Sequence, residues 1–167
     1  MTLSLVRHAA VGLATALIAT SGLAANVLSV KEKVELSVPP DKAWEVIKDF
    51  DGWQNWHPAV ASTEITSGKG NTRGTVRVLT LKDGGKITER LERYQPKVFA
   101  YTYRIIDSPL PVTDYVSTIQ VKAAKSGSVV NWTSHFKAKE GTEDAEATKV
   151  MRGVYRAGLD NLKTKLK

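Results

Sequence analysis

The sequence predicts an α+β domain in which one antiparallel sheet packs against one long C-terminal helix. Three observations support this prediction. Helical patterns occur only in residues 39–58 and in residues 143–166. Between them, short runs alternate apolar and polar residues and are separated by turns rich in glycine or proline. The 167 residues contain no internal repeat, and this length suits a single core.

The first two dozen residues have the layout of a secretory signal. Arg7 supplies a basic start, residues 9–18 form an apolar run, and residues 20–25 are small enough for signal peptidase. The apolar run is shorter than the roughly 20 residues that span a membrane. We therefore expect residues 1–24 to be a signal peptide and residues 25–167 to be one exported domain without a transmembrane segment. Cleavage after residue 25 is the alternative.

The composition excludes several kinds of site. The chain has no cysteine, so disulfides, thiol nucleophiles and cysteine metal ligands are absent. Removal of residues 1–24, which carry one arginine and no acidic residue, lowers the formal net charge from +7 to +6. This basic excess serves solubility, or it attracts an acidic protein partner or anionic lipid head groups. The basic residues are scattered, which argues against a nucleic-acid partner.

The first part of the domain is predicted to be a strand followed by two short helices. Residues 27–38 alternate as a half-buried strand, and a proline pair ends it. Four apolar residues then recur at three- and four-residue spacing and predict one buried helix face: Ala43, Trp44, Ile47 and Phe50. Residues 53–57 form a second short turn. Trp44 is expected to belong to the core.

Six further strands and one helix follow. The strands are predicted at residues 60–66, 75–81, 86–94, 98–106, 112–123 and 129–139. The turn Lys82–Gly85 is a strong hairpin signal, and Asp107–Pro111 is a loop stiffened by proline. The helix at residues 143–166 begins acidic and ends rich in lysine, as the helix dipole favours. The predicted central stripe of this helix consists of Val150, Val154, Gly158 and Leu162. Ala147, Met151 and Tyr155 widen it.

This order of elements resembles the helix-grip fold of the START/Bet v 1-like (SRPBCC) superfamily, which includes polyketide cyclases/dehydratases and lipid-transport proteins. The segments that carry the resemblance are residues 39–58, ITERLERY at 87–94, VVNWTSHF at 129–136 and the closing helix. The resemblance covers the whole chain after residue 24. It implies a curved antiparallel sheet of about seven strands wrapped around the long helix. It also implies a hydrophobic cavity between them that binds a small ligand.

A narrower resemblance concerns exported bacterial members of this size. The chain resembles periplasmic accessory proteins of methanol oxidation of the MxaD type. This resemblance implies a periplasmic location, with a methanol dehydrogenase and its acidic cytochrome as partners. The basic surface of the chain would then steer that association.

The family pattern implies which residues line the cavity. These are Trp56, Val78, Glu89, Tyr101, Tyr103, Tyr115, Trp132, Val150, Val154 and Gly158. The tyrosines either belong to the core or donate hydrogen bonds to a ligand carbonyl or carboxylate. Gly158 either leaves room for a ligand or permits close packing of the helix on the sheet. The segments Lys82–Gly85 and Asp107–Pro111 occupy the places of the family's entrance loops.

Glu89 is the main charged group of this set. It is either a solvated residue paired with Arg90 or Arg93, or a cavity residue whose pKa is raised by burial. We expect His57 to be a surface or capping residue rather than a catalytic one, and His135 to face outward. No metal or cofactor site is expected, because the histidines are far apart and no phosphate-binding loop or nucleophile motif occurs.

The sequence is compatible with three functions. The leading one is a non-catalytic binding or accessory protein. The second is a cyclase, dehydratase or isomerase that uses Glu89 as its general base. The third is a carrier of a lipid or quinone, which requires a continuous apolar cavity of roughly several hundred Å³.

Overall fold

The computed structural model describes residues 26–167, so the expected signal peptide and its cleavage site lie outside the described residues. Its strands are β1 (Leu28–Leu36), β2 (Val60–Ser67), β3 (Val76–Leu81), β4 (Lys86–Gln95), β5 (Ala100–Asp107), β6 (Val112–Ala124) and β7 (Gly127–Ala138). Its helices are α1 (Pro40–Ile47), α2 (Asp144–Lys165) and the single 3-10 turns η1 (Trp53–Asn55) and η2 (Pro96–Val98). The bounds of the strands and of α2 differ from the predicted ones by no more than two residues.

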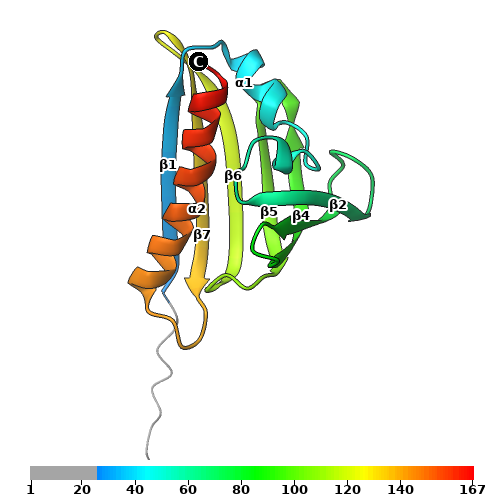
Figure 1. The fold of residues 1–167 in the computed structure, drawn as a ribbon, viewed down its shortest axis with the longest axis vertical. Coiled ribbons are helices and arrows are strands. Elements are labelled where there is room, and N and C mark those ends of the chain that lie inside the picture. Colours follow the sequence, from blue (N-terminus) through cyan, green and yellow to red (C-terminus); the bar gives the residue numbers. More distant parts are fainter. Residues whose placement is uncertain (1–25) are drawn as a thin grey trace, which may run out of the picture.

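All seven strands form one antiparallel sheet, in the order β1-β7-β6-β5-β4-β3-β2. Strands β2 to β7 follow one another as a meander, whereas β1 pairs with β7, with Leu28 opposite Phe136 and Leu36 opposite Ser128. Strands β1 and β2 are therefore the two edges of the sheet, although they are consecutive in the chain. The segment that joins them, with α1 and η1, crosses one face of the curved sheet (Figure 1).

Helix α2 lies on the same face and runs along β1 and β7 (Figure 1). On its outer side, Glu32 of β1 accepts hydrogen bonds or ion pairs from Arg152 and Arg156 at 3.1 and 3.2 Å. The buried residues of α2 are Ala147, Met151, Tyr155, Gly158, Leu159 and Leu162.

The predicted stripe of α2 is therefore wrong at its centre. Val150 and Val154 are only half-buried, and Met151 and Tyr155 take the central positions. Two neighbouring apolar rows satisfy the 3.6-residue period almost equally well. The larger Met151 and Tyr155 side chains fill the space under the sheet.

The short helix α1 buries Ala43, Trp44 and Ile47. Trp44 packs against Tyr94 and Tyr101, with ring centroids 5.7 and 6.0 Å apart, and the prediction that it belongs to the core is confirmed. Within residues 26–167, no helix has the length and apolar character needed to cross a membrane.

Candidate functional site

A cavity of about 290 Å³ lies between α2, the η1 segment and the inner face of the sheet. Its walls are mostly apolar and are contributed by Val60, Leu79, Leu81, Ile87, Ile105, Leu110, Met151 and Val154. Its aromatic lining consists of Trp53, Tyr103, Tyr115 and Trp132. Only Glu89 and His57 add an ionisable group other than a tyrosine. The cavity is thus an apolar chamber with few polar atoms.

The mouth of the cavity is formed by small side chains. Ala59, Gly153 and Ala157 line the cavity and are exposed to solvent. A Cβ atom added at Gly153 would meet no atom within 4 Å. Of the two expected entrance segments, Asp107–Pro111 contributes Leu110, whereas Lys82–Gly85 contributes no lining residue. The opening therefore runs past the middle of α2.

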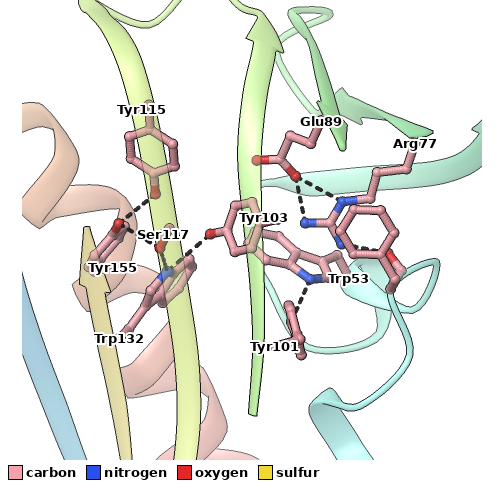
Figure 2. Close-up of polar contacts among 10 residues, drawn as sticks. Trp53, Arg77, Glu89, Tyr101, Tyr103, Tyr115, Ser117, Trp132 and Tyr155 are labelled. Carbon is pink, nitrogen blue, oxygen red and sulfur yellow. Dashed lines mark hydrogen bonds and ion pairs between the residues drawn. The ribbon is translucent and has the colours of Figure 1, made fainter. Parts of the chain in front are cut away.

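A buried ion pair borders the cavity, because Glu89 lines the cavity and pairs with Arg77 (Figure 2). Arg77 donates from Nε and Nη2 to the same oxygen of Glu89, Oε2, at 2.8 and 2.5 Å. Its third nitrogen, Nη1, donates to the carbonyl oxygen of Phe50. The guanidinium lies between the rings of Phe50 and Trp53, with Cζ 4.0 Å from each ring centroid. Such stacking is favourable for a guanidinium removed from water.

This geometry decides between the two interpretations of Glu89. Arg77 and Glu89 are direct cross-strand partners of β3 and β4, and both are buried. The alternative in which Glu89 is solvated and paired with Arg90 or Arg93 is wrong. Those two arginines are half-buried or exposed, and Arg90 pairs with Glu92 on the opposite face of the strand.

The carboxylate of Glu89 has one oxygen left for the cavity. Burial raises the pKa of Glu89, and the Arg77 guanidinium opposes this rise. Both bonds from Arg77 go to Oε2, and Oε1 accepts no hydrogen bond from any residue between 26 and 167. Figure 2 shows this second oxygen without a partner. Because Glu89 lines the cavity, Oε1 is an acceptor available to a bound molecule.

A second polar group is organised around Trp132. Its Nε1 donates to the hydroxyl oxygens of Tyr103 and Ser117, both at 3.0 Å (Figure 2). Ser117 donates its own proton to the carbonyl oxygen of Thr133 at 2.9 Å. The Ser117 oxygen can then only accept from other hydroxyl groups.

The direction of the remaining bonds follows from this constraint. Tyr155 donates to Ser117 at 3.1 Å, and Tyr115 donates to Tyr155 at 2.5 Å. Burial raises the pKa of Tyr103, Tyr115 and Tyr155, so all three keep their protons. The protons of Tyr115 and Tyr155 are used inside the network. The hydroxyl of Tyr103 donates no hydrogen bond of ordinary geometry within residues 26–167, and its neighbour Ser117 only moderates the rise in the pKa of Tyr103.

His57 is buried, so the expectation of a surface histidine is wrong. Its ring stacks on Trp53 at 5.8 Å. Nε2 donates to the carbonyl oxygen of Val154 at 3.1 Å, and Nδ1 accepts from the backbone N–H of Ala59 at 3.3 Å. Burial lowers the pKa of His57 to about 4, so the imidazole is neutral at pH 7. His57 therefore ties the η1 segment to α2 beside the cavity.

Five of the predicted cavity residues are brought together by the fold: Glu89, Tyr103, Tyr115, Trp132 and Val154. Tyr101 is buried elsewhere, where its hydroxyl accepts from Trp53 Nε1 at 3.0 Å. Val150 is half-buried and lies outside the cavity. His135 is exposed, as predicted.

Val78 does not face inward, and neither Trp56 nor Gly158 lines the cavity. In β3 the residues that point to the core are Arg77 and Leu79, so Val78 lies on the other face. A Cβ atom at Gly158 would lie 3.0 Å from Trp56 and from Trp132. Gly158 thus permits close packing of α2 and leaves no space for a ligand.

The lining residues that sequence reasoning missed include Trp53, His57 and Leu79, together with Arg77, which holds Glu89. Among residues 26–167, no group of three or more histidine and acidic side chains is arranged to hold a metal ion.

Comparisons with known proteins agree with this architecture. The chain is 34% identical to the protein XoxI from Bacillus cereus, which it matches over 84% of its own length and 94% of that chain, with a TM-score of 0.74. An uncharacterised protein from Bacillus thuringiensis is also 34% identical, with 84% and 98% of the chains covered and a TM-score of 0.74.

Ara h 8.0201 shows the fold at lower identity. It is 21% identical, over 84% of this chain and 98% of that one, with a TM-score of 0.70. The Bet v 1-like helix-grip fold expected from the sequence is thereby confirmed. Residues 27–167 match the family described as polyketide cyclase / dehydrase and lipid transport. The chain therefore belongs to this family, within the SRPBCC superfamily.

Proposed function

We propose that this protein binds a compact hydrophobic molecule in the cavity between α2 and the sheet. The observation that supports the proposal is an apolar chamber with an open mouth of small residues. Its volume of about 290 Å³ is at the lower end of the usual range for ligand sites, roughly 300–1,000 Å³. This size favours a molecule of one or two rings over a long-chain lipid or quinone.

One observation supports a catalytic alternative. Glu89 Oε1 is free toward the cavity, and burial raises the pKa of this carboxyl group, as a general base requires. The same carboxylate is held by Arg77, which weakens it as a base. The geometry therefore favours binding, with a cyclase, dehydratase or isomerase activity as the second candidate.

The mouth supplies a test of binding. Prodan, a neutral fluorophore built on one two-ring naphthalene, should bind wild-type protein saturably with enhanced emission. Gly153→Phe should weaken this binding at least about tenfold, because its ring projects into the mouth, where the structure leaves open space. Gly153→Ala is the matched control, because it also replaces the helix glycine but its methyl group is too short to reach across the mouth of the cavity. Absence of saturable binding to wild type, or equal binding by all three proteins, would refute the proposal.

We also propose that the protein acts outside the cytoplasm. The support is the pattern of residues 1–25, with its basic start, apolar run and small residues. Sequencing the N-terminus of the protein purified from its own cells is the test. A mature chain that begins at residue 25 or 26 is expected, and a chain that retains residues 1–24 would contradict export.

A basic surface supports an additional role as an accessory protein of the MxaD type. On the outer face of the sheet, four arginines surround the single carboxylate of Glu92: Arg73, Arg90, Arg93 and Arg104. Arg90 and Arg104 approach Glu92 to 2.9 and 3.4 Å, and the excess charge remains positive. Such a surface suits an acidic partner, and we propose a methanol dehydrogenase or its cytochrome.

Salt dependence tests this role. Association with the methanol dehydrogenase and cytochrome of the same organism should be measurable at low ionic strength and should weaken as salt screens the charges. Charge reversal at Arg73 and Arg93 should abolish it. Lys149→Glu/Lys163→Glu, at two exposed positions on α2, is the control for total charge, because it reverses the same number of charges. No association at low salt, or equal loss in the control, would contradict the role.

A further inference from the structure

We propose that the cavity selects a neutral ring compound bearing a hydroxyl group, whose proton is donated to Glu89 Oε1. This inference rests on the proposed binding function and specifies its ligand class. A bound molecule can reach only a few polar atoms of the cavity, and most of them are already hydrogen-bonded within the protein. Both nitrogens of His57 are occupied by Val154 and Ala59. The indole nitrogens of Trp53 and Trp132 donate to hydroxyl groups of the protein.

Two polar groups of the cavity wall remain without such a partner. Among residues 26–167, Glu89 Oε1 accepts no hydrogen bond, and the hydroxyl of Tyr103 donates none of ordinary geometry, with Ser117 as its polar neighbour. In the register of β4 and β5, Glu89 is opposite Ile105 and Leu91 is opposite Tyr103. Glu89 and Tyr103 are therefore diagonal neighbours on the inner face, about 7–8 Å apart at the backbone, within reach of long side chains. One acceptor and one donor thus lie on the same wall.

The charge balance of this wall sets the charge of the ligand. Arg77 already compensates Glu89, and its three nitrogens are all engaged, with Glu89 and Phe50. An anionic group would therefore meet the carboxylate oxygen with no free cation beside it. An apolar group would leave the buried Oε1 unsatisfied, which is unfavourable for a charged acceptor.

A hydroxyl group fits both unused atoms. Its proton satisfies Glu89 Oε1, and its oxygen can accept from Tyr103. The remainder of the molecule then contacts the aromatic and aliphatic walls, which favour a flat ring system. A neutral phenol or cyclic alcohol of one or two rings is the class of ligand that satisfies all of these contacts within about 290 Å³.

Three matched compounds test this class on the wild-type protein by displacement of prodan: 2-naphthol, 2-methylnaphthalene and 2-naphthoate. They share one ring system and differ in a hydroxyl, a methyl or a carboxylate group. Because hydrogen bonds to charged groups are the stronger ones, 2-naphthol should bind about tenfold to a hundredfold more tightly than 2-methylnaphthalene. It should also bind more tightly than 2-naphthoate.

Glu89→Gln assigns the preference to its acceptor. The amide oxygen of glutamine must face Arg77, so its NH₂ group faces the cavity, and the preference for 2-naphthol should fall below about threefold. Glu92→Gln is the matched control, because Glu92 lies on the outer face of the same strand. If Glu89→Gln fails to fold, the double variant Arg77→Met/Glu89→Gln contains no uncompensated buried charge and should lose the preference too.

The possible results separate this inference from the proposed function. Equal affinity for 2-naphthol and 2-methylnaphthalene would overturn the inference and leave hydrophobic binding intact. Tighter binding of 2-naphthoate, or a preference that persists in both folded Glu89 variants, would also overturn it. If none of the compounds, including the fluorophore, binds wild type, the proposed function itself fails.

Discussion

The buried imidazole of His57 should make the stability of this protein depend on pH in the acidic range. The side chain is 3% exposed, and both ring nitrogens are engaged in the neutral state. Protonation of Nδ1 would break the bond from the Ala59 N–H and place a charge near Arg77, which also lowers the pKa of His57. The test is to compare the stability of wild type and His57→Gln as the pH is lowered from 7.5 to 4.

The magnitude follows from the two pKa values. The pKa of His57 is about 4 in the folded chain and 6.5 for an unperturbed histidine. One pKa unit corresponds to about 1.4 kcal/mol, so the contribution is roughly 3 kcal/mol. Because the folded pKa is the lower one, the unfolded chain binds more protons between these values. The stabilisation is therefore fully present above pH 6.5 and is lost as the pH falls toward 4.

Urea unfolding at a series of pH values measures this effect. At pH 7.5, His57→Gln should be less stable than wild type, because it loses the stacking on Trp53 and one hydrogen bond. The difference should shrink by roughly 3 kcal/mol by pH 4, since only wild type loses the histidine contribution. Acid effects on Glu89 occur in both proteins and cancel.

His135→Gln is the matched control, because an exposed imidazole is solvated in the folded and the unfolded chain alike. Its pH profile should run parallel to that of wild type. Parallel profiles for wild type and His57→Gln would refute the reasoning, because they would show that His57 binds protons equally in both states.

Two further predictions concern the core beside the cavity. Arg77→Met should lower the free energy of unfolding by about 3–5 kcal/mol, because it leaves the carboxylate of Glu89 buried without a partner. The double variant Arg77→Met/Glu89→Leu should recover most of this loss. Urea unfolding measures both effects. An unchanged stability of the single variant would contradict the buried pair. Gly158→Ala should lower the free energy of unfolding by about 1–3 kcal/mol through overpacking, because its Cβ would lie 2.7 Å from His57 Cδ2. Gly153→Ala places its Cβ in open space and should raise the free energy of unfolding by up to about 1 kcal/mol through its better helix propensity. Equal effects at the two glycines would contradict this difference in packing.

The strands and α2 could be predicted from the sequence because each has a regular pattern and a clear end. The alternation in residues 86–94, for example, places Ile87, Glu89 and Leu91 on one face, and the structure buries all three. The chain order of the elements then sufficed for the family. What the pattern left open was which of two apolar rows in α2 faces the sheet.

The prediction that Val78 of β3 faces inward was wrong, because Arg77 does not look like a core residue. Val78 is more apolar, and a charged residue is almost never fully buried unless it is paired. A signal was nevertheless present in the turn Lys82–Gly85. The backbone N–H of Leu81 donates to the carbonyl oxygen of Gly85 at 2.8 Å, and this turn continues into a register with Arg77 opposite Glu89. Hairpin register combined with opposite charge would have identified the pair.

The position of His57 could not be found in this way. Its partner Val154 is 97 residues away in the chain, and the pairing depends on how α2 is laid over the η1 segment. The family pattern predicted Trp56 as the cavity residue of segment 39–58. Within it, however, the cavity wall is formed by Trp53 and His57, whereas Trp56 packs beneath α2.

The asymmetry of the Arg77–Glu89 pair is what most strongly connects the fold to a function. Arginine and a carboxylate commonly form two parallel hydrogen bonds to two oxygens, which leaves neither oxygen free in that direction. Here both bonds converge on Oε2, and the third nitrogen is held by Phe50, so the arrangement leaves Oε1 toward the cavity. Apolar residues of similar volume can replace a buried ion pair without loss of stability. Stability alone therefore does not account for the pair, and its open oxygen is the feature that a ligand would use. If Arg77→Met/Glu89→Leu remains as stable as wild type while its preference for 2-naphthol disappears, the pair serves recognition rather than folding.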